Sequence, residues 1–237
     1  MRYAYAVLSA GIFGIIIFFA HTATQPRIHD FFQLQRATIQ GIPFTFVRVP
    51  SQAVTMRVAV TSSTVAAVTT AAPAVVVNGG YFAGIDFIPA GFVASGGKKI
   101  SERLFDKDKS GGLFYNGAIT IEDAVQNNFL QAPESIQSYP ILIRAGKSAV
   151  EKDSSHIARR TAIALDAAGN VVIIIADEKE ISLYEFSQAL AEFQPHIVTA
   201  INLDGGASTG IAVHGTNGTE SIDSYTPVAN VVIFEKK

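Results

Sequence analysis

Residues 197–206 have the sequence Ile-Val-Thr-Ala-Ile-Asn-Leu-Asp-Gly-Gly, in which an apolar segment runs directly into a polar turn. The segment 197–203 predicts a strand, and Asp204-Gly205-Gly206 predicts a turn at its end. An earlier stretch, residues 74–80, repeats the pattern as Ala-Val-Val-Val-Asn-Gly-Gly. Its first four residues are wholly apolar, which favours a strand buried on both faces. Each turn therefore follows an expected central strand.

Paired glycines at a strand end permit positive φ angles and allow a ligand to approach the backbone closely. Successive free N–H groups in such a turn can form a nest that binds anions. Asn78 and Asp204 precede the two glycine pairs, so both side chains are expected to project into one pocket if the turns share a sheet. Asn-Gly and Asp-Gly are also common hairpin turns, and that plainer interpretation is the better one for either turn alone.

The remaining pattern is dominated by short strands. Ser182 and Glu185 have the spacing of a capping box and predict the start of a helix over residues 182–193, along which apolar residues recur every three or four positions. A second, Ala-rich helix is expected over 63–72, ended by Pro73. A short helix is also expected within 21–40, and hairpins with exposed loops over 83–117. Strands are expected at 44–49, 56–60, 74–77, 139–144, 161–165, 171–176, 197–203 and 228–234. We therefore predict a single α+β domain, rich in mixed β-sheet, with a few packed helices.

Composition limits the classes of function. The chain has 237 residues and a net charge of −2, so nothing in its charge balance favours nucleic-acid binding. Charged residues make up only 16%, and the 19 glycines suit a β-rich domain with many tight turns. The absence of cysteine excludes disulfides, a cysteine nucleophile and zinc held by thiolates.

The N-terminus predicts export. Residues 3–20 form an uncharged apolar run behind Arg2, and a helix of this length would span about 27 Å, near the thickness of a bilayer core. We expect residues 1–24 to be a signal peptide or an N-terminal membrane anchor, residues 25–39 a linker, and 40–237 the folded domain. Residues 3–20 would contact the membrane if they are not cleaved. The domain would then be periplasmic, or anchored to the membrane and facing outward.

The two turns and the segment between them resemble the phosphodiester glycosidase family. Asn78-Gly79-Gly80-Tyr81-Phe82 is similar to its NGG-aromatic-Phe motif, and residues 202–209, Asn-Leu-Asp-Gly-Gly-Ala-Ser-Thr, to its NLDGG-x-S-[ST] motif. Residues 160–164, Arg-Thr-Ala-Ile-Ala, look like its R-T-A-I-G segment, with Ala164 in place of glycine. The similarity extends over roughly residues 40–235. Ala164 and Ala207, where the family often has glycine, are departures from the pattern.

This resemblance implies hydrolysis of a sugar-1-phosphodiester, with N-acetylglucosamine-1-phosphodiester as one candidate. The family includes the uncovering enzyme, which acts on lysosomal glycans, and exported bacterial members associated with exopolysaccharides. Asp204, Arg160 and Asn78 are the expected catalytic residues. The expected substrate-binding residues are Gly79, Gly80, Asn202, Gly205, Gly206, Ser208, Thr209 and Arg144.

The chemistry of a phosphodiester explains this choice of residues. Glycoside hydrolysis passes through an oxocarbenium-like state and ordinarily uses two carboxyl groups, one of which protonates the leaving group. A phosphate monoester is already a stable anion on departure, so a cation that holds it matters more than an acid. Arginine supplies that cation through a bidentate fork. We therefore expect one carboxylate, Asp204, with Arg160 and Arg144 as phosphate clamps; Asp86 and Glu102 are weaker candidates for a second carboxylate.

Two other interpretations stay open. In the first, the same fold holds an anionic glycan without turnover, as a non-catalytic envelope protein. A metal-dependent phosphodiesterase, with Asp204 as a ligand, is less favoured because the five histidines show no ligand spacing. We expect no metal site and no cofactor, although calcium at Asp204 is left open. The expected partner is a phosphodiester-linked sugar or glycan, with no nucleic acid.

Overall fold

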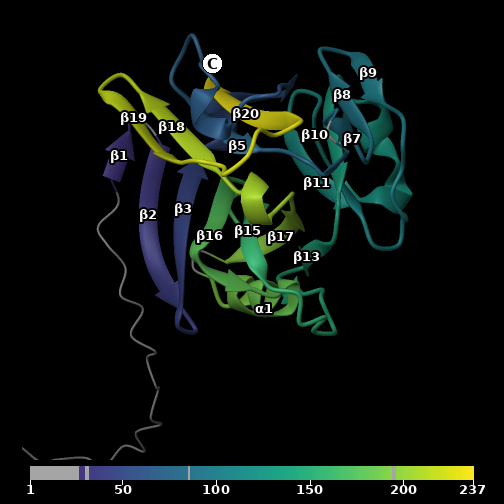
Figure 1. The fold of residues 1–237 in the computed structure, drawn as a ribbon, viewed down its shortest axis with the longest axis vertical. Coiled ribbons are helices and arrows are strands. Elements are labelled where there is room, and N and C mark those ends of the chain that lie inside the picture. The colour runs from purple at the N-terminus through teal and green to yellow at the C-terminus, as the bar shows by residue number, and fades with distance from the viewer. Residues whose placement is uncertain (1–26, 30–31, 85, 194–195) are drawn as a thin grey trace, which may run out of the picture.

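The computed structural model describes residues 27–29, 32–84, 86–193 and 196–237. Its first sheet has eight strands and carries the long central hairpin of the chain (Figure 1). Their order is β1 (Arg27–His29), β2 (Phe32–Ile39), β3 (Ile42–Val49), β16 (Val171–Ile181), β15 (Ala158–Asp166), β17 (Ile197–Asn202), β13 (Ile141–Arg144) and β14 (Lys147–Ser148).

Two five-stranded sheets complete the fold. The second sheet has the order β19 (Gly218–Ile222), β18 (Ile211–Gly215), β5 (Ala74–Asn78), β20 (Asn230–Lys236) and β4 (Val54–Val60). The third has the order β11 (Ile119–Asp123), β10 (Gly111–Tyr115), β12 (Glu134–Ser138), β8 (Val93–Ser95) and β9 (Lys98–Ser101). A small hairpin joins β6 (Phe82–Ala83) to β7 (Ile88–Pro89).

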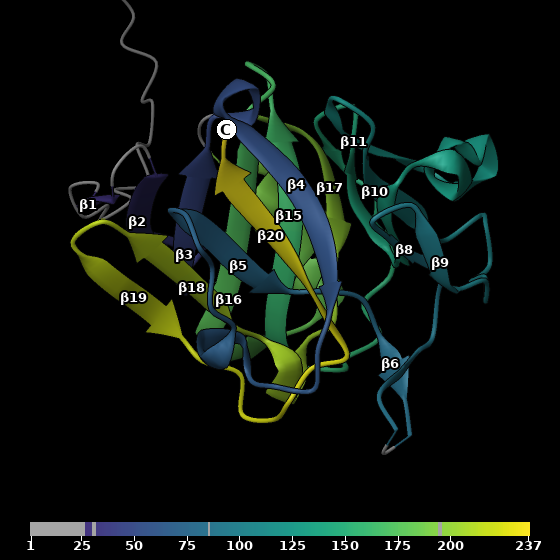
Figure 2. The same cartoon turned by 90° about the horizontal axis from the view of Figure 1, so that it is seen from above.

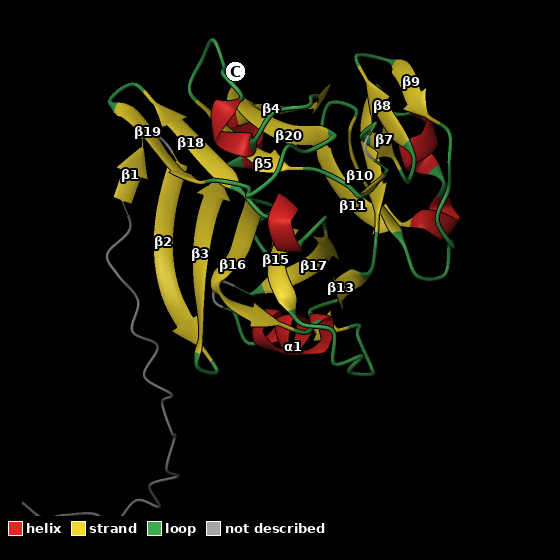
Figure 3. Ribbon diagram, in the orientation of Figure 1, coloured by secondary structure: helices red, strands yellow, loops and turns green. Residues whose placement is uncertain are grey.

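The first and second sheets lie face to face, as Figure 2 shows. Apolar residues of β15 and β16 on one face, such as Ile163 and Ile173, pack against residues of the second sheet, such as Val58 and Val77. The opposite face of the same strands is covered by the one α-helix of the described chain, α1 (Leu183–Ala191) (Figure 3). Strands buried on both faces need apolar side chains at successive positions, and β16 begins with six fully buried residues.

The predicted capping box is confirmed. The backbone N–H of Glu185 donates to Ser182 Oγ at 3.2 Å, and the N–H of Ser182 donates to a carboxylate oxygen of Glu185 at 2.8 Å. These bonds satisfy donors that a helix end leaves unpaired. The predicted strands in 44–49, 56–60, 74–77, 139–144, 161–165, 171–176, 197–203 and 228–234 correspond to β3, β4, β5, β13, β15, β16, β17 and β20.

The fold is more strongly β than predicted. The described strand pairings are all antiparallel, so the expected mixed sheet is wrong for this part of the chain. The remaining helical turns are short 3₁₀ segments: η1 (Ser51–Ala53), η2 (Val65–Ala67), η3 (Ala124–Gln126), η4 (Asn128–Gln131) and η5 (Gly206–Ser208). The segment 83–117 does form hairpins, but β10 within it is a buried strand of the third sheet.

The expected helix over 63–72 is only the single turn η2. Asp223, distant in sequence, accepts bonds from the Ala66 N–H at 2.9 Å and the Thr64 hydroxyl at 3.0 Å. These tertiary bonds hold a short turn, and the β-branched residues that follow have low helix propensity.

The linker and short helix predicted before residue 40 are also corrected over 32–39. These residues form β2, which pairs with β3 along its length. Gln40 and Gly41 connect the two strands with φ values of 51° and 73°, as a type I′ hairpin turn requires. The expected signal or anchor at 1–24 lies outside the described residues. Within the described residues, no helix is long and apolar enough to cross a membrane.

Candidate functional site

The two Gly-Gly turns meet where the first sheet joins the second. β5 ends at Asn78 and β17 ends at Asn202, so each turn leaves a different sheet. The Asp204 N–H donates to the carbonyl oxygen of Gly79 at 3.1 Å, and Asn78 Nδ2 donates to the carbonyl oxygen of Asp204 at 2.7 Å. The turns predicted to line one pocket therefore lie side by side, although they belong to different sheets.

Asn78 connects the turns and is fully buried. Its Oδ1 accepts bonds from the Thr161 hydroxyl at 2.9 Å and the Gly210 N–H at 3.1 Å. Its Nδ2 donates to the carbonyl oxygens of Asp204 and Gly79. Asn78 was predicted to be catalytic. Because both polar atoms of its amide are engaged inside the protein, the structure instead places it to hold the two turns together.

The glycines of the two turns are favoured for different structural reasons. A Cβ on Gly79 would lie 1.9 Å from Asn230 Oδ1, and one on Gly205 would lie 2.7 Å from the Arg159 carbonyl oxygen. Only Gly206, with φ +58°, has the positive angle expected for these four glycines. Close backbone approach therefore requires Gly79 and Gly205, and backbone conformation favours Gly206.

The expected anion-binding nest is not free at three of these positions. The Gly79 and Gly80 N–H groups donate to the carbonyl oxygen and Oδ1 of Asn230, each at 2.9 Å. The Gly205 N–H donates to Asp204 Oδ1 at 2.9 Å. Side chains are therefore the principal groups left for a ligand in this part of the site.

Asp204 is partly buried at the start of the second turn. Burial raises the pKa of its carboxyl group above the usual value, while hydrogen bonds from the Ser208 hydroxyl and the Gly205 N–H act to lower it. The carboxyl group therefore stays protonated to a higher pH than an exposed aspartate, and its basicity is increased.

Arg160 lies on β15, next to β17, the strand that leads into the Asp204 turn, and its side chain is buried. Its Nε donates to the carbonyl oxygen of Ile181 at 2.9 Å, and one terminal nitrogen donates to the carbonyl oxygen of His156 at 2.5 Å. Burial lowers its pKa from the usual value, and the nearby Tyr81 and Glu180 act in the opposite direction. Two of its five N–H donors are committed to these backbone oxygens, so the guanidinium is fixed in orientation with donors to spare.

Tyr81 was predicted only as the aromatic residue of the NGG-aromatic-Phe motif, with no role of its own. Its hydroxyl accepts a bond from Asn202 Nδ2 at 2.6 Å and donates to the Tyr139 carbonyl oxygen at 3.0 Å. Burial raises the pKa of Tyr81, Tyr139 and Asp204 raise it further, and Arg160 acts to lower it. The Tyr81 hydroxyl is thus electrostatically coupled to both Asp204 and Arg160, and it remains protonated.

Aromatic rings form one side of this cluster. The rings of Tyr81 and Tyr139 are stacked with centroids 4.7 Å apart, and Phe105 meets Tyr139 edge-on at 4.9 Å. Tyr139 keeps 39% of its surface exposed, so part of this wall is open to solvent. The aromatic motif position Tyr81 gave a sequence signal, but nothing in the sequence linked Phe105 to it.

The other predicted binding residues divide into two groups. Asn202, Ser208 and Thr209 lie at the joined turns and are buried; within the described structure, Asn202 Oδ1 and the Thr209 hydroxyl have no hydrogen-bond partner. Arg144 lies at the other end of β13, beside the start of β17, and forms an ion pair with Asp123. The structure therefore does not bring Arg144 to Asp204, because β13 and β17 run antiparallel.

The weaker carboxylate candidates are exposed. Glu102 forms an ion pair with Lys99 at 3.2 Å, and Asp86 lies in the turn between β6 and β7. In the described ranges there is no group of three or more His, Asp or Glu side chains arranged to hold a metal ion.

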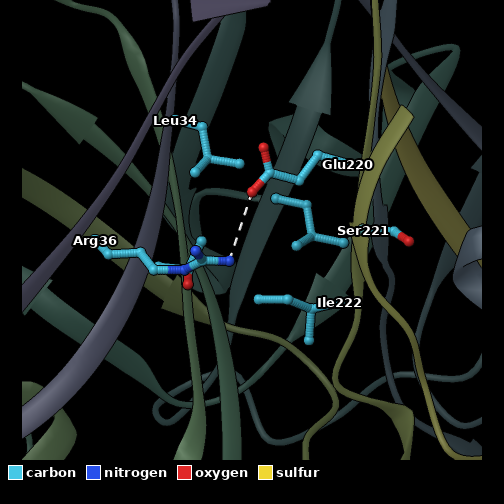
Figure 4. Close-up of a pocket in the computed structure, with 7 residues that line it drawn as sticks. Leu34, Arg36, Glu220, Ser221 and Ile222 are labelled. Carbon is cyan, nitrogen blue, oxygen red and sulfur yellow. Dashed lines mark ion pairs between the residues drawn. The ribbon is translucent and has the colours of Figure 1, made fainter. Parts of the chain in front are cut away.

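A small cavity lies elsewhere, between β2, β3 and β18–β19 (Figure 4). Arg36 and Glu220 approach to 3.5 Å at its edge. Its volume of about 10 Å³ suits at most one water molecule. It is too small for a sugar and is not the substrate site.

The family of the chain follows from its sequence together with these joined turns. The model of the phosphodiester glycosidase family matches residues 71–235, which includes both turns and Arg160. The chain belongs to the phosphodiester glycosidase family. No curated protein matches it.

Two solved structures have a similar fold. The catalytic domain of zebrafish N-acetylglucosamine-1-phosphodiester alpha-N-acetylglucosaminidase, auto-inhibited by its pro-peptide, has 16% sequence identity and a TM-score of 0.66. The match covers 92% of this chain and 88% of the zebrafish chain. A hypothetical protein from Synechocystis has 17% identity and a TM-score of 0.61, with 86% of this chain and 62% of that chain covered. The present chain thus spans less than two thirds of the Synechocystis protein.

Proposed function

We propose that this phosphodiester glycosidase hydrolyses a sugar-1-phosphodiester at the joined turns, with Asp204 and Arg160 as the reacting pair. The observation that carries the proposal is the place of Arg160 beside the turn that holds Asp204: a Cβ on Gly205, the residue after Asp204, would lie 3.9 Å from Cδ of the buried Arg160 side chain. A carboxylate and a guanidinium at one turn are the two groups that this reaction needs. Family membership supports the same class of substrate.

Asp204 acts in its ionised form at the anomeric carbon. It either removes a proton from the attacking water, or bonds to that carbon itself and forms a glycosyl ester that water then hydrolyses, which restores the carboxylate. The bond from the anomeric carbon to the phosphate oxygen breaks, and a phosphate monoester leaves with the bonding electrons. Because the phosphate monoester leaves as a stable anion, a paired acid of the ordinary glycosidase kind is not required.

Arg160 holds the phosphate through the N–H groups that its two backbone bonds leave free. A fixed, bidentate cation stabilises the negative charge that grows on the leaving group, and burial strengthens this interaction relative to water. Asn202, Ser208 and Thr209 bind the substrate from the second turn, with Gly206 allowing its approach. Asn78, Gly79, Gly80 and Gly205 maintain the geometry.

The cellular role is proposed from the sequence. The apolar residues 3–20 support export, to the periplasm or to the outer side of a membrane anchor, and a role in envelope or exopolysaccharide metabolism. The zebrafish enzyme of similar fold is named for N-acetylglucosamine-1-phosphodiester, so N-acetylglucosamine is the first sugar to test. No cofactor enters the proposed reaction.

The test is sugar release from UDP-N-acetylglucosamine and from p-nitrophenyl-linked sugar phosphodiesters by the purified chain, with and without EDTA. Asp204→Asn is compared with Asp108→Asn, which changes an exposed aspartate in the loop before β10. We expect release by the wild type and by Asp108→Asn, in EDTA as well, and none by folded Asp204→Asn.

Other outcomes point to the competing interpretations. Activity lost on chelation would make Asp204 part of a metal site. Binding of anionic glycans by both wild type and Asp204→Asn, with no turnover of any substrate, would identify a non-catalytic glycan-binding protein.

A further inference from the structure

An exposed tyrosine stands beside the second Gly-Gly turn and has no part in the reaction proposed above. Tyr225 lies in the loop between β19 and β20, which passes beside η5 (Figure 2). It keeps 75% of its surface exposed, more than any other large apolar or aromatic side chain of the described chain. An open aromatic face next to a reaction site is a surface on which a ligand ring can stack.

The loop that carries Tyr225 is fixed to the segment that follows Asp204. The Tyr225 N–H donates to the carbonyl oxygen of Ala207, in η5, at 2.8 Å. A Cβ on Gly210 would lie 2.8 Å from the backbone nitrogen of Ser224, so the two backbones are in close contact there as well. Tyr225 therefore has a defined position beside the turn in which Asp204 lies.

Arg159 fixes the orientation of the Tyr225 ring from its inner side. The guanidinium carbon lies 4.1 Å from the ring centroid, which is a cation–π contact. Arg159 is 4% exposed, and its Nη2 donates to the Asp223 carbonyl oxygen at 3.4 Å. Its Nε and Nη1 have no hydrogen-bond partner in the part of the chain that the structure describes, so the ring is a principal contact of this buried cation. A ring held in this way loses little conformational entropy when a ligand stacks on its outer face.

The same arginine connects the ring to the proposed phosphate clamp. A Cβ on Gly205 would lie 2.7 Å from the Arg159 carbonyl oxygen and 3.9 Å from Arg160 Cδ, so both residues meet the second turn at one glycine. The aglycone is bonded to the phosphate that Arg160 is proposed to hold, and it extends from that phosphate away from the sugar. The exposed ring thus stands next to the part of the site from which the aglycone extends.

The surroundings of the ring favour a flat aromatic group over a second sugar. The two residues before Tyr225 have polar side chains that are already engaged. Both carboxylate oxygens of Asp223 and the hydroxyl of Ser224 accept bonds from residues 64–66. A sugar needs partners for its hydroxyl groups, whereas a planar ring needs only the open face of Tyr225.

We propose that Tyr225 stacks on a planar aromatic ring in the aglycone and is a specificity-determining residue for phosphodiesters of aromatic alcohols or of nucleosides. Arg159 acts as its positioning residue. The inference rests on the proposed function, because it assigns the group on the leaving side of the phosphate that Arg160 holds.

The kinetic test compares two substrates that differ only in the aglycone, the phenyl and the methyl phosphodiester of N-acetylglucosamine-1-phosphate, with the full chain purified in detergent. Tyr225→Ala removes the ring, and Tyr225→Phe keeps it without the hydroxyl. Tyr184→Ala is the matched control, since it changes a partly exposed tyrosine in α1, on the other face of the first sheet. A second measurement, independent of hydrolysis, is the affinity of the same proteins for phenyl phosphate and for methyl phosphate by calorimetry.

We expect Tyr225→Ala to lower kcat/KM on the phenyl substrate by about five- to tenfold and on the methyl substrate by less than about twofold. Tyr225→Phe should keep the wild-type ratio between the two substrates, and Tyr184→Ala should change neither rate. Phenyl phosphate should bind the wild type more tightly than methyl phosphate does, and Tyr225→Ala should remove that difference.

Equal losses on both substrates would assign Tyr225 to the fold and overturn the inference. It is also overturned if phenyl phosphate binds no more tightly than methyl phosphate, or binds Tyr225→Ala as it binds the wild type. Tyr225-dependent binding of phenyl phosphate without hydrolysis of either substrate would refute the proposed reaction and support the stacking role of Tyr225.

Discussion

The backbone N–H of Asp204 donates to the carbonyl oxygen of Gly79 at 3.1 Å, which ties the end of β17 to the end of β5. The bond joins two sheets at the position of Asp204, the carboxylate that we propose takes part in the reaction. Asn78 Nδ2 reinforces it by binding the Asp204 carbonyl oxygen at 2.7 Å. The position of Asp204 thus depends on backbone geometry in both turns.

The ionisation of Asp204 predicts the acid limb of the pH profile. Since burial raises its pKa, the low-pH limb of kcat/KM should lie above the range of an ordinary aspartate, and activity should fall as pH decreases through it. Ser208→Ala removes a bond that lowers this pKa, so its limb should move to higher pH. A pH profile on a phosphodiester substrate measures both. If the acid limb of Ser208→Ala is unchanged, Asp204 is not the group whose ionisation sets that limb.

The raised pKa of Asp204 also predicts how the stability of the Asp204→Asn variant compares with that of the wild type. A raised folded pKa means that the native state binds the proton more tightly, so stability falls as pH rises between the unfolded and folded pKa values. Asp204→Asn should therefore not lower the free energy of unfolding at pH 7. Because the proposed reaction needs the carboxylate, the same substitution should reduce kcat by about a thousandfold or more. Urea unfolding of both proteins checks this. A large loss of stability would show that the carboxylate is structural.

Replacing Arg160 should lower kcat/KM more for a substrate with a charged phosphate than for an uncharged one. Arg160→Lys loses the bidentate fork, and kcat/KM on a phosphodiester should fall by about 10- to 100-fold. An uncharged aryl glycoside, if turned over, should be affected much less. Because Arg160 also donates to Ile181 and His156, thermal unfolding is measured alongside. Equal losses on both substrates would assign Arg160 to the fold.

Gly79 and Gly80 should respond differently to the same methyl group. An added Cβ on Gly79 would lie 1.9 Å from Asn230 Oδ1, whereas the nearest atom to one on Gly80 is at 3.4 Å. Gly79→Ala should lower the free energy of unfolding by about 1–3 kcal/mol, and Gly80→Ala by less than about 1 kcal/mol. Urea unfolding measures the two variants. Equal effects would contradict close packing at Gly79.

Asp166 should stabilise the β15–β16 hairpin above the acid range. Burial acts to raise its pKa, but hydrogen bonds from Asn170 and Ala168, together with Arg48, lower it below the usual value. The stabilisation is complete above the unfolded pKa and is lost as pH falls through the folded one. Asp166→Asn should cost about 1–3 kcal/mol at pH 7 and progressively less in acid. A difference that persists at pH 2 would refute this.

Local signals in the sequence determined much of the fold. The capping box at Ser182 and the apolar runs that became β5, β16 and β17 act over a few residues, so they could be recognised directly. The Gln40-Gly41 turn was not predicted, because the segment before it was expected to be helical. Over 63–72, an alanine-rich pattern favoured a helix, and Asp223, far along the chain, decided otherwise.

The sequence by itself determined that two polar Gly-Gly turns follow buried strands and that Asp204 and Arg160 belong to a phosphodiester glycosidase pattern. Only the tertiary structure decided that Arg160, and not Arg144, lies with the turns, because strand direction places Arg144 at the other end of β17. It also placed the Tyr81 hydroxyl against Asn202, at the start of the second turn, and the Gly79 backbone against Asn230. These relations join residues far apart in the chain, and packing between sheets sets such distances while local patterns do not.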